Sequence, residues 1–535
     1  MIVTSARRAP GQARSLAESS SFLFPRRARL RYTTEASHDR PTAARRRQFH
    51  DYFVTHIPRS SLHPDPRGPT SSFHKLPRSA SIPHTGDTPR SPTNFQALVG
   101  RETTVVRVPL RSAKHHFGAV SARGTRLSNE DTYQAGVIDI PAFAKRPPAS
   151  LTIKRDAEDQ SRESRGAQTA SGDPQVFYFG IFDGHGGAEC STFLRDNLHE
   201  YIQNAAADFE LQSSLRGNRQ RIGDLEKTLV QNWRQLVGGY FKRFKPSNFF
   251  YYGTESAADA RATGCASIEE VMEYAFLRAD MDFVEAQAAK RDDDLVQAEK
   301  PLNEDEILHS PSQTRSIKIG GRARFKGGST ASVAMISTPT PTPFWHPVGP
   351  SSLLISHVGD TRILLCSTTT GEAIPLTSNH HPSSPIEASR LRRYAATFVT
   401  DSFGEERMSG LANTRAFGDV QSKRIGVSAE PELRRIEMGP AEFSFLVMVS
   451  DGISGTLLDQ EVVDIIKEAR TPDQGATDVV KFATEVTKEG DNATCLVIRL
   501  GGWERRLEGG VGSLGTKESR EWRQQEATDP RRSRT

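Results

Sequence analysis

The stretch VFYFGIFDGHGG, residues 176–187, joins an apolar run to a cluster of chemically active residues and glycines. Seven mostly bulky apolar residues are long enough for a strand buried on both faces. The run ends on an aspartate, a histidine and three glycines. Because Asp-Gly is a common turn pair, a simple hairpin is one interpretation, and a functional site at the end of a buried strand is the other.

Composition limits the class of protein. The 535 residues are 36% hydrophobic and include 31 prolines and 41 glycines, which indicates that part of the chain forms a large core and part does not. The four cysteines lie far apart without a C-x-x-C pair, so disulfides and zinc are disfavoured and a reducing compartment is expected. Since no apolar run approaches the ~18–20 residues of a spanning helix, we expect no membrane span.

The N-terminal segment has a composition of its own. Residues 1–50 carry eleven arginines, no lysine and three acidic residues, although the net charge of the whole chain is only +5. An Arg-rich, Ser-rich and acid-poor start is typical of a mitochondrial transit peptide and predicts a location in the mitochondrial matrix. A nucleic-acid-binding arm or plain disorder is the alternative. Residues 51–100, dense in proline and serine and without periodicity, are interpreted as a linker.

Residues 101–500 show the periodicity of one folded domain. Apolar runs of strand length recur at 176–182, 331–336, 352–358, 361–366, 443–450 and 494–500. Between them lie helical patterns, of which the clearest opens with the capping-box spacing of Ser267 and Glu270. Strands and helices each come in adjacent pairs, which favours an antiparallel sheet over βαβ units.

Several segments lack this periodicity. Three of them interrupt the domain near 145–173, 243–266 and 337–352, and are predicted to be surface loops inserted into it. The tail from 501 to 535 is polar and is predicted to be disordered.

Acidic residues recur at the boundaries of the predicted strands. They are Glu130 and Asp131 in RLSNED, Asp183, Asp360 in HVGD, Asp451 in VSDG, and Asp491 in GDNAT. One Asp-Gly pair is more often a turn than a site. Carboxylates that gather at one edge of a buried sheet repel one another, however, and a cation would have to neutralise them. Hard cations with oxygen ligands, Mg²⁺ or Mn²⁺, suit a set of Asp and Glu without clustered Cys or His.

Seven motifs, in one order, resemble those of the metal-dependent type 2C protein serine/threonine phosphatases. They are RGTRLSNED, FGIFDGHGG, GGSTASVAMI, HVGDTR, LANTRAFGD, VSDG and GDNAT, between residues 115 and 500. The resemblance implies an α+β fold, an αββα sandwich of two antiparallel sheets flanked by helix pairs. It also implies a site for two Mg²⁺ or Mn²⁺ ions at one end of the sheets, and hydrolysis of phosphoserine and phosphothreonine by a metal-activated water.

The resemblance assigns roles to individual residues. Asp183 is expected to bridge two ions, with Asp451 and Asp491 completing the shell of one ion, and with Glu130 and the Gly184 carbonyl reaching the other. Asp131 is expected to orient waters bound to the metals.

Two further side chains are assigned to the phosphate and the leaving group. Arg126 is expected to grip the phosphate through its planar guanidinium, although a surface arginine in a turn is the alternative. His185 is the candidate general acid for the serine or threonine alkoxide, with a structural histidine as the alternative.

The sequence departs from the family pattern at two positions. Asn379 in LTSNHHP stands where the family usually has Asp, and Ser454-Gly455 stands where it usually has Trp-Asp. Both bear on a third, weaker metal position that the family builds partly from Asp451. A neutral amide is a poorer ligand for a hard cation than a carboxylate, so this third position is in doubt while the two-metal set is intact.

The expected function is a metal-dependent phosphoprotein phosphatase. Mitochondrial members of the family resemble the chain in having such a leader, and some act on phosphorylated pyruvate dehydrogenase, which is therefore the candidate substrate. The alternative is an inactive pseudophosphatase scaffold that binds partners through its insertions, but Asp183, Asp451 and Asp491 are all retained. We expect a phosphoprotein partner and a monomer. We expect no nucleic-acid partner, since no basic face of the folded domain is indicated.

Overall fold

The computed structural model describes thirteen stretches of the chain. They are residues 52–58, 103–109, 115–144, 175–211, 219–252, 266–290, 319–340, 342–392, 398–400, 406–408, 410–487, 490–507 and 514–528. All belong to one of two compact units, Arg47–Thr535. The predicted transit peptide at 1–50, most of the linker and the insertion at 145–173 lie outside the described residues.

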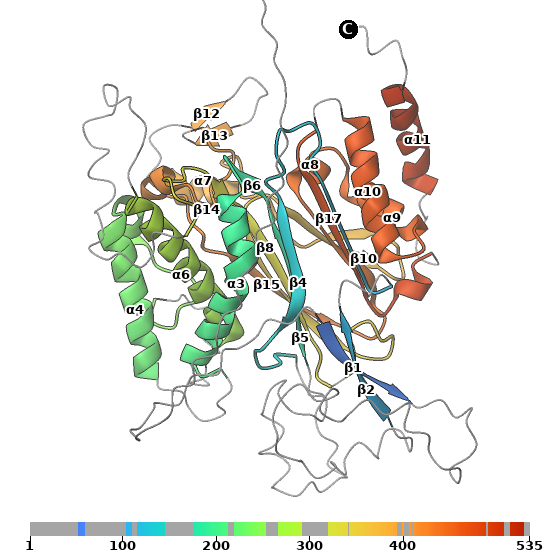
Figure 1. Cartoon of the computed structure of the whole chain (residues 1–535), viewed down its shortest axis with the longest axis horizontal. Helices are drawn as coiled ribbons and strands as arrows, with labels where there is room; N and C mark the ends of the chain where they lie inside the picture. The colour runs from blue at the N-terminus through green and yellow to red at the C-terminus, as the bar shows by residue number, and fades with distance from the viewer. Residues whose placement is uncertain are drawn as a thin grey trace, which may run out of the picture. The chain divides into compact units, whose positions relative to one another are not determined.

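Two five-stranded sheets form the centre of this unit (Figure 1). One has the order β15 (Glu432–Met438), β9 (Ser351–Val358), β8 (Ala331–Ser337), β5 (Val176–Phe182) and β4 (Thr132–Ile138). The other has the order β11 (Ala373–Pro375), β10 (Arg362–Ser367), β16 (Phe443–Val449), β17 (Ala493–Arg499) and β3 (Phe117–Ala122). Neighbouring strands in both sheets pair antiparallel, as predicted.

Strand β5 is buried on both faces because it lies between two apolar layers. Side chains alternate across a strand. Phe177, Phe179 and Ile181 therefore enter the core between the two sheets. Tyr178 and Phe182 point the other way, into the core under the helices. Its run of bulky apolar residues follows from this double burial, which leaves no face for polar residues.

Helices cover the outer face of each sheet, which completes the predicted αββα sandwich (Figure 1). On one side lie α3 (Glu189–Asp208), α4 (Arg219–Leu236) and α6 (Ile268–Ala288). On the other lie α9 (Asp459–Glu468) and α10 (Pro472–Val486). The capping box of Ser267 and Glu270 begins α6 as predicted. Among the described helices, none is both long and apolar enough to cross a membrane.

Shorter strands and helices complete the described part of the chain. The strands are β1 (Tyr52–Pro58), β2 (Thr103–Pro109), β6 (Gly184–His185), β7 (Gly328–Ser329), β12 (Phe398–Thr400), β13 (Glu406–Met408) and β14 (Phe417–Gly418). The helices and 3-10 turns are η4 (Gly239–Arg243), α7 (Pro385–Leu391), η8 (Val420–Ile425), α8 (Asp451–Ser454), η9 (Trp503–Arg505) and α11 (Leu514–Thr528). A small sheet of order β14-β7-β6 begins directly after Asp183, at the end of β5.

The predicted disordered tail is wrong for residues 514–528, which form α11. Polar contacts rather than apolar ones hold this helix to the domain. Arg523 forms an ion pair with Glu461 of α9 at 2.9 Å and also donates to the Thr456 carbonyl at 2.7 Å. Thr516 donates to Asp464 at 2.7 Å. The polar composition of this segment therefore did not indicate a helix, because ion pairs and hydrogen bonds bind it to the domain.

Two of the predicted surface loops are partly buried. In the 243–266 segment, Phe249 is fully buried, and the backbone N–H groups of Ser247 and Asn248 donate to the Glu273 carboxylate of α6 at 2.9 and 2.6 Å. In the 337–352 segment, Phe344 enters the core between the sheets and contacts the ring of Phe177 edge to face, 4.7 Å away. A few aromatic side chains fix each loop, and such isolated anchors leave no periodic signal.

Candidate active site

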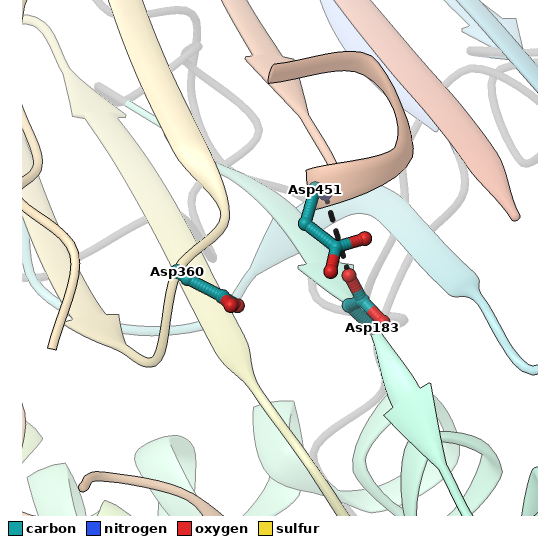
Figure 2. Close-up of side chains that lie close together, drawn as sticks. All are labelled: Asp183, Asp360 and Asp451. Carbon is teal, nitrogen blue, oxygen red and sulfur yellow. Dashed lines mark hydrogen bonds between the residues drawn. The ribbon is translucent and has the colours of Figure 1, made fainter. Parts of the chain in front are cut away.

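Three aspartates from distant strands meet at one end of the sheets. Asp183 follows β5, Asp360 follows β9, and Asp451 follows β16 as the first residue of α8. Figure 2 shows their side chains pointing toward one another. Each offers a carboxylate oxygen that lies within 4.8 Å of the other two, and the Asp451 N–H donates to the Asp183 carboxylate at 3.4 Å. The predicted gathering of strand-end carboxylates is confirmed for these three residues.

The cluster is electrostatically strained. Burial, followed by the charge of Asp451, raises the pKa of Asp183 well above its usual range. Burial and the charge of Asp360 raise the pKa of Asp451 to about 7. Because like charges in a poorly solvated site disfavour ionisation, the three carboxylates ionise together only with a compensating positive charge.

Buried oxygens around the cluster fit a cation. Asp131 is buried, and its Oδ2 accepts a hydrogen bond from the Thr494 hydroxyl at 2.7 Å. Within the part of the chain that the structure describes, its Oδ1 and the Oδ1 of buried Asp360 have no hydrogen-bond partner. Unpaired buried oxygens are costly, and native proteins usually satisfy them with a donor, a water or an ion. An all-oxygen set of this kind matches the donor preference of Mg²⁺ or Mn²⁺.

Gly184 lies where the backbone turns against Glu130. A Cβ at Gly184 would lie 2.6 Å from the Glu130 carbonyl oxygen, so no larger residue fits without a shift of the backbone. The Ser191 hydroxyl at the start of α3 donates to the same Glu130 carbonyl at 2.6 Å. The close approach of residues 130 and 184 is therefore built into the fold.

Asn492 holds the loop that carries Glu130. Its side-chain amide donates to the Arg123 and Ser128 carbonyls at 2.8 and 3.0 Å, and its Oδ1 accepts from the Glu130 N–H at 2.8 Å. Sequence reasoning gave no role to Asn492, although the GDNAT motif contains it. The residue type is a signal, because an asparagine amide can donate and accept hydrogen bonds and so hold a neighbouring turn.

Arg126 and Asp491 form an ion pair with each other. The Nη2–Oδ2 distance is 2.5 Å, and both side chains are partly or largely exposed. Asp491 is therefore near the cluster but is not one of the three carboxylates that share it. The phosphate-gripping role predicted for Arg126 stays a prediction. Its position beside a site aspartate is compatible with that role.

His185 is held by Asp419, the last residue of the LANTRAFGD motif. Asp419 is buried, and both of its oxygens lie 2.9 Å from His185 Nε2. The small β14-β7-β6 sheet brings the two residues together across Gly328. Burial alone would lower the pKa of His185, but the hydrogen bond and the charge of Asp419 raise it. The imidazole therefore keeps its proton to a higher pH than an ordinary histidine, which suits a proton donor.

Asn379 and Gly455, where the sequence departs from the family pattern, are not part of the cluster. Asn379 is exposed. A Cβ at Gly455 would lie 2.9 Å from the Asp451 carbonyl oxygen, so this position does not accept a larger residue without adjustment. The cluster contains Asp360 in addition to Asp183 and Asp451. The sequence marked Asp360 as an acidic residue at a strand end but gave no role for it.

Comparisons with known proteins agree with this geometry. Residues 265–492 match the family described as Protein phosphatase 2C. The chain is 32% identical over 403 residues to Protein phosphatase 2C homolog 4 of Schizosaccharomyces pombe, covering 75% of the chain and 84% of that protein. It is 32% identical over 353 residues to a protein of Xenopus laevis named Protein phosphatase 1K, mitochondrial, covering 65% of the chain and 68% of that protein.

Among solved structures, a serine-threonine phosphatase 2C from Toxoplasma gondii aligns with 72% of the chain and 94% of its own, at 15% identity and a TM-score of 0.41. The sequence relationship is the stronger finding, because one relative is aligned over most of its length. The chain therefore belongs to the protein phosphatase 2C family and is a protein serine/threonine phosphatase.

Proposed function

We propose that the chain hydrolyses phosphoserine and phosphothreonine with two bound Mg²⁺ or Mn²⁺ ions, and that the aspartate cluster is part of the site that binds these ions. The observation that supports this proposal is the convergence of Asp183, Asp360 and Asp451 within 4.8 Å, with raised pKa values at Asp183 and Asp451. Divalent cations, when bound, lower the pKa of water to near neutrality and neutralise charge that develops on the phosphoryl group.

The residues present suit this cofactor. Asp183, Asp451 and Asp491 would supply carboxylate oxygens, and Glu130 with the Gly184 carbonyl would supply oxygens from the facing loop. Asp131 would orient water through its unpaired Oδ1. The absence of a Cβ at Gly184 supports this assignment, because it lets the backbone at residue 184 lie close to the Glu130 loop.

The chain's own groups position the substrate and supply the proton. Arg126, after exchanging its ion pair with Asp491, would bind phosphate oxygens through its fork of N–H groups. His185 would protonate the departing serine or threonine oxygen from a ring nitrogen. Asp419 accepts a hydrogen bond from Nε2–H of the protonated ring, and so fixes the orientation of that ring. Positioning and electrostatics then carry most of the acceleration, as in phosphoryl transfer generally.

Hydrolysis of a phosphothreonine peptide with Mn²⁺ and with EDTA tests the proposal. We expect release of phosphate with Mn²⁺ only, and no release by Asp183→Asn, whose side chain keeps its size but loses its charge. Asp459→Asn is the matched control, because Asp459 pairs with Arg362 at 2.6 Å and is not part of the cluster. Equal rates in EDTA and Mn²⁺, or an active Asp183→Asn, would refute the metal-site assignment.

We also propose that the chain acts in the mitochondrial matrix, on phosphorylated pyruvate dehydrogenase among other phosphoproteins. The Arg-rich start supports the location, as does the mitochondrial name of the Xenopus relative. Fusion of residues 1–60 to a fluorescent reporter tests it: matrix fluorescence is expected, and cytosolic or nuclear fluorescence contradicts it. Release of phosphate from the phosphorylated dehydrogenase, compared with a scrambled phosphopeptide, tests the substrate.

A further inference from the structure

Helix α11 lies on the outside of the domain beside α9 and α10 (Figure 1), and neither the phosphatase motifs nor the proposed metal site gives it a role. Its polar side chains contact acidic residues of those two helices. The contacts join Thr516 to Asp464, Arg520 to Glu468, Arg523 to Glu461, and Gln524 to Glu485. A helix held in this way is useful to the domain through what its side chains hold in return.

Arg523 reaches the turn between α8 and α9. Its Nη1 donates to the Glu461 carboxylate at 2.9 Å, and its Nη2 donates to the Thr456 carbonyl at 2.7 Å. The Glu461 side chain is only 3% exposed, and its Oε2 also accepts the Leu458 N–H at 3.0 Å, just before α9 begins. The planar guanidinium, with two donors in a fixed fork, therefore ties the end of α8 to the start of α9.

This turn is continuous with the residue that α8 contributes to the aspartate cluster. Asp451 is the first residue of α8, and its carbonyl accepts the Gly455 N–H at 2.7 Å. The Thr456 hydroxyl donates to the Gly452 carbonyl at 3.2 Å. A helix of four residues is not stable by itself, so the groups that hold its ends decide its orientation. Carbonyls around a helix C-terminus lack donors from the helix, and Arg523 supplies one to Thr456.

We propose that Arg523 is a positioning residue for Asp451: by holding the α8–α9 turn, it keeps the Asp451 carboxylate directed toward Asp183. The inference rests on the proposed metal-dependent function, because a carboxylate that is held in place binds a cation more tightly than a mobile one. Arg520 offers a matched comparison within α11. It forms an ion pair with Glu468 at 3.1 Å, at the opposite end of α9 from the turn.

Hydrogen exchange of the full-length chain in EDTA, followed by mass spectrometry, tests whether Arg523 holds the turn. We expect Arg523→Met, which keeps the length of the side chain but has no donor, to speed exchange of the Gly455 and Leu457 amides by about 10-fold. Arg520→Met should leave these two amides as they are in the wild type. Unchanged exchange at the turn in Arg523→Met overturns the inference, and so does an equal increase in both variants.

Calorimetric titration with Mn²⁺ tests the consequence for the site. We expect Arg523→Met to weaken Mn²⁺ binding by about 10-fold, and Arg520→Met to bind like the wild type. Arg523→Lys keeps the charge opposite Glu461 but not the fork that also reaches Thr456, so its Mn²⁺ affinity should stay reduced. Full recovery of affinity by lysine would mean that charge alone matters, and would overturn the positioning role.

The same titrations separate this inference from the proposed function. A wild-type chain that binds Mn²⁺ and hydrolyses phosphopeptide, while Arg523→Met titrates identically, refutes the inference alone. A wild-type chain that neither binds Mn²⁺ nor hydrolyses phosphopeptide refutes the proposed function, and the exchange measurement then still decides whether Arg523 holds the turn.

Discussion

Replacing Asp451 by asparagine should stabilise the metal-free protein while destroying its metal response. Burial and the charge of Asp360 raise the pKa of Asp451 from 3.8 to about 7. At about 1.4 kcal/mol for each pKa unit, the ionised carboxylate lowers the free energy of unfolding by ~4 kcal/mol at pH 8. Asparagine removes this charge, and the backbone N–H of residue 451 can still donate a hydrogen bond to Asp183. We therefore expect Asp451→Asn to gain ~2–4 kcal/mol in EDTA at pH 8.

The difference in the free energy of unfolding between Asp451→Asn and the wild type depends on pH and on bound metal. A carboxyl whose folded pKa lies above its unfolded pKa makes the native state less stable as the pH rises from about 4 to 7. The gain of the variant should therefore shrink as the pH falls from 7 toward 4. Bound Mn²⁺ at 100 times its Kd stabilises the wild type by about 2.7 kcal/mol, whereas the variant has lost a ligand. The difference between the two proteins should thus narrow or reverse when Mn²⁺ is added.

Urea unfolding followed by tryptophan fluorescence measures these free energies, since Trp233 and Trp503 are buried. Wild type, Asp451→Asn and Asp459→Asn are compared at pH 8 and pH 5, in EDTA and with Mn²⁺. Asp459→Asn should lose up to ~1 kcal/mol, because it only breaks the ion pair with Arg362. If Asp451→Asn is less stable than the wild type in EDTA at pH 8, the electrostatic account of the cluster is wrong.

Two further substitutions test other parts of the structure. His185→Gln should reduce turnover of a phosphoserine peptide by about 10²–10⁴-fold and affect an aryl phosphate far less, because a phenolate leaves without a proton; equal losses in the two steady-state assays would remove His185 as the acid. Lys423→Met should lower the free energy of unfolding by about 3–5 kcal/mol in urea titrations, because it leaves Asp280 buried without its partner, 2.5 Å away. A loss below ~1 kcal/mol would mean that water reaches Asp280.

The fold was predictable where it depends on apolar periodicity. Residues 176–182 are mostly bulky and apolar without alternation, which indicated a strand buried on both faces, and the end of this run at Asp-Gly marks the sheet edge where Asp183 lies. Helix α11 escaped prediction because ion pairs, rather than an apolar stripe, hold it in place. Charged side chains have the same appearance in a sequence whether they face solvent or a partner.

The site was predictable only in part, for a related reason. Asp183 and Asp451 each follow a strand, so their places at strand ends were predictable. Their strands belong to different sheets, however, and which strand ends meet depends on how the two sheets pack. The contact of His185 with Asp419 depends on paired strands of two residues, which are too short to produce any periodicity. The position of Asp360 in the aspartate cluster depends on the direction of one side chain after a turn, which the sequence does not show (Figure 2).

The small β14-β7-β6 sheet has a consequence for mutational scanning. A Cβ at Gly327 would lie 2.1 Å from the His185 carbonyl oxygen, and one at Gly328 would lie 2.4 Å from the Phe417 carbonyl oxygen. In a growth selection for phosphatase activity, both glycines should tolerate as few replacements as the aspartates do. A map of the positions that tolerate no substitution would thus not distinguish these two glycines from the site aspartates. Only a parallel screen for abundance would separate them, since a missing carboxylate leaves the protein folded and a side chain crowded into this small sheet does not.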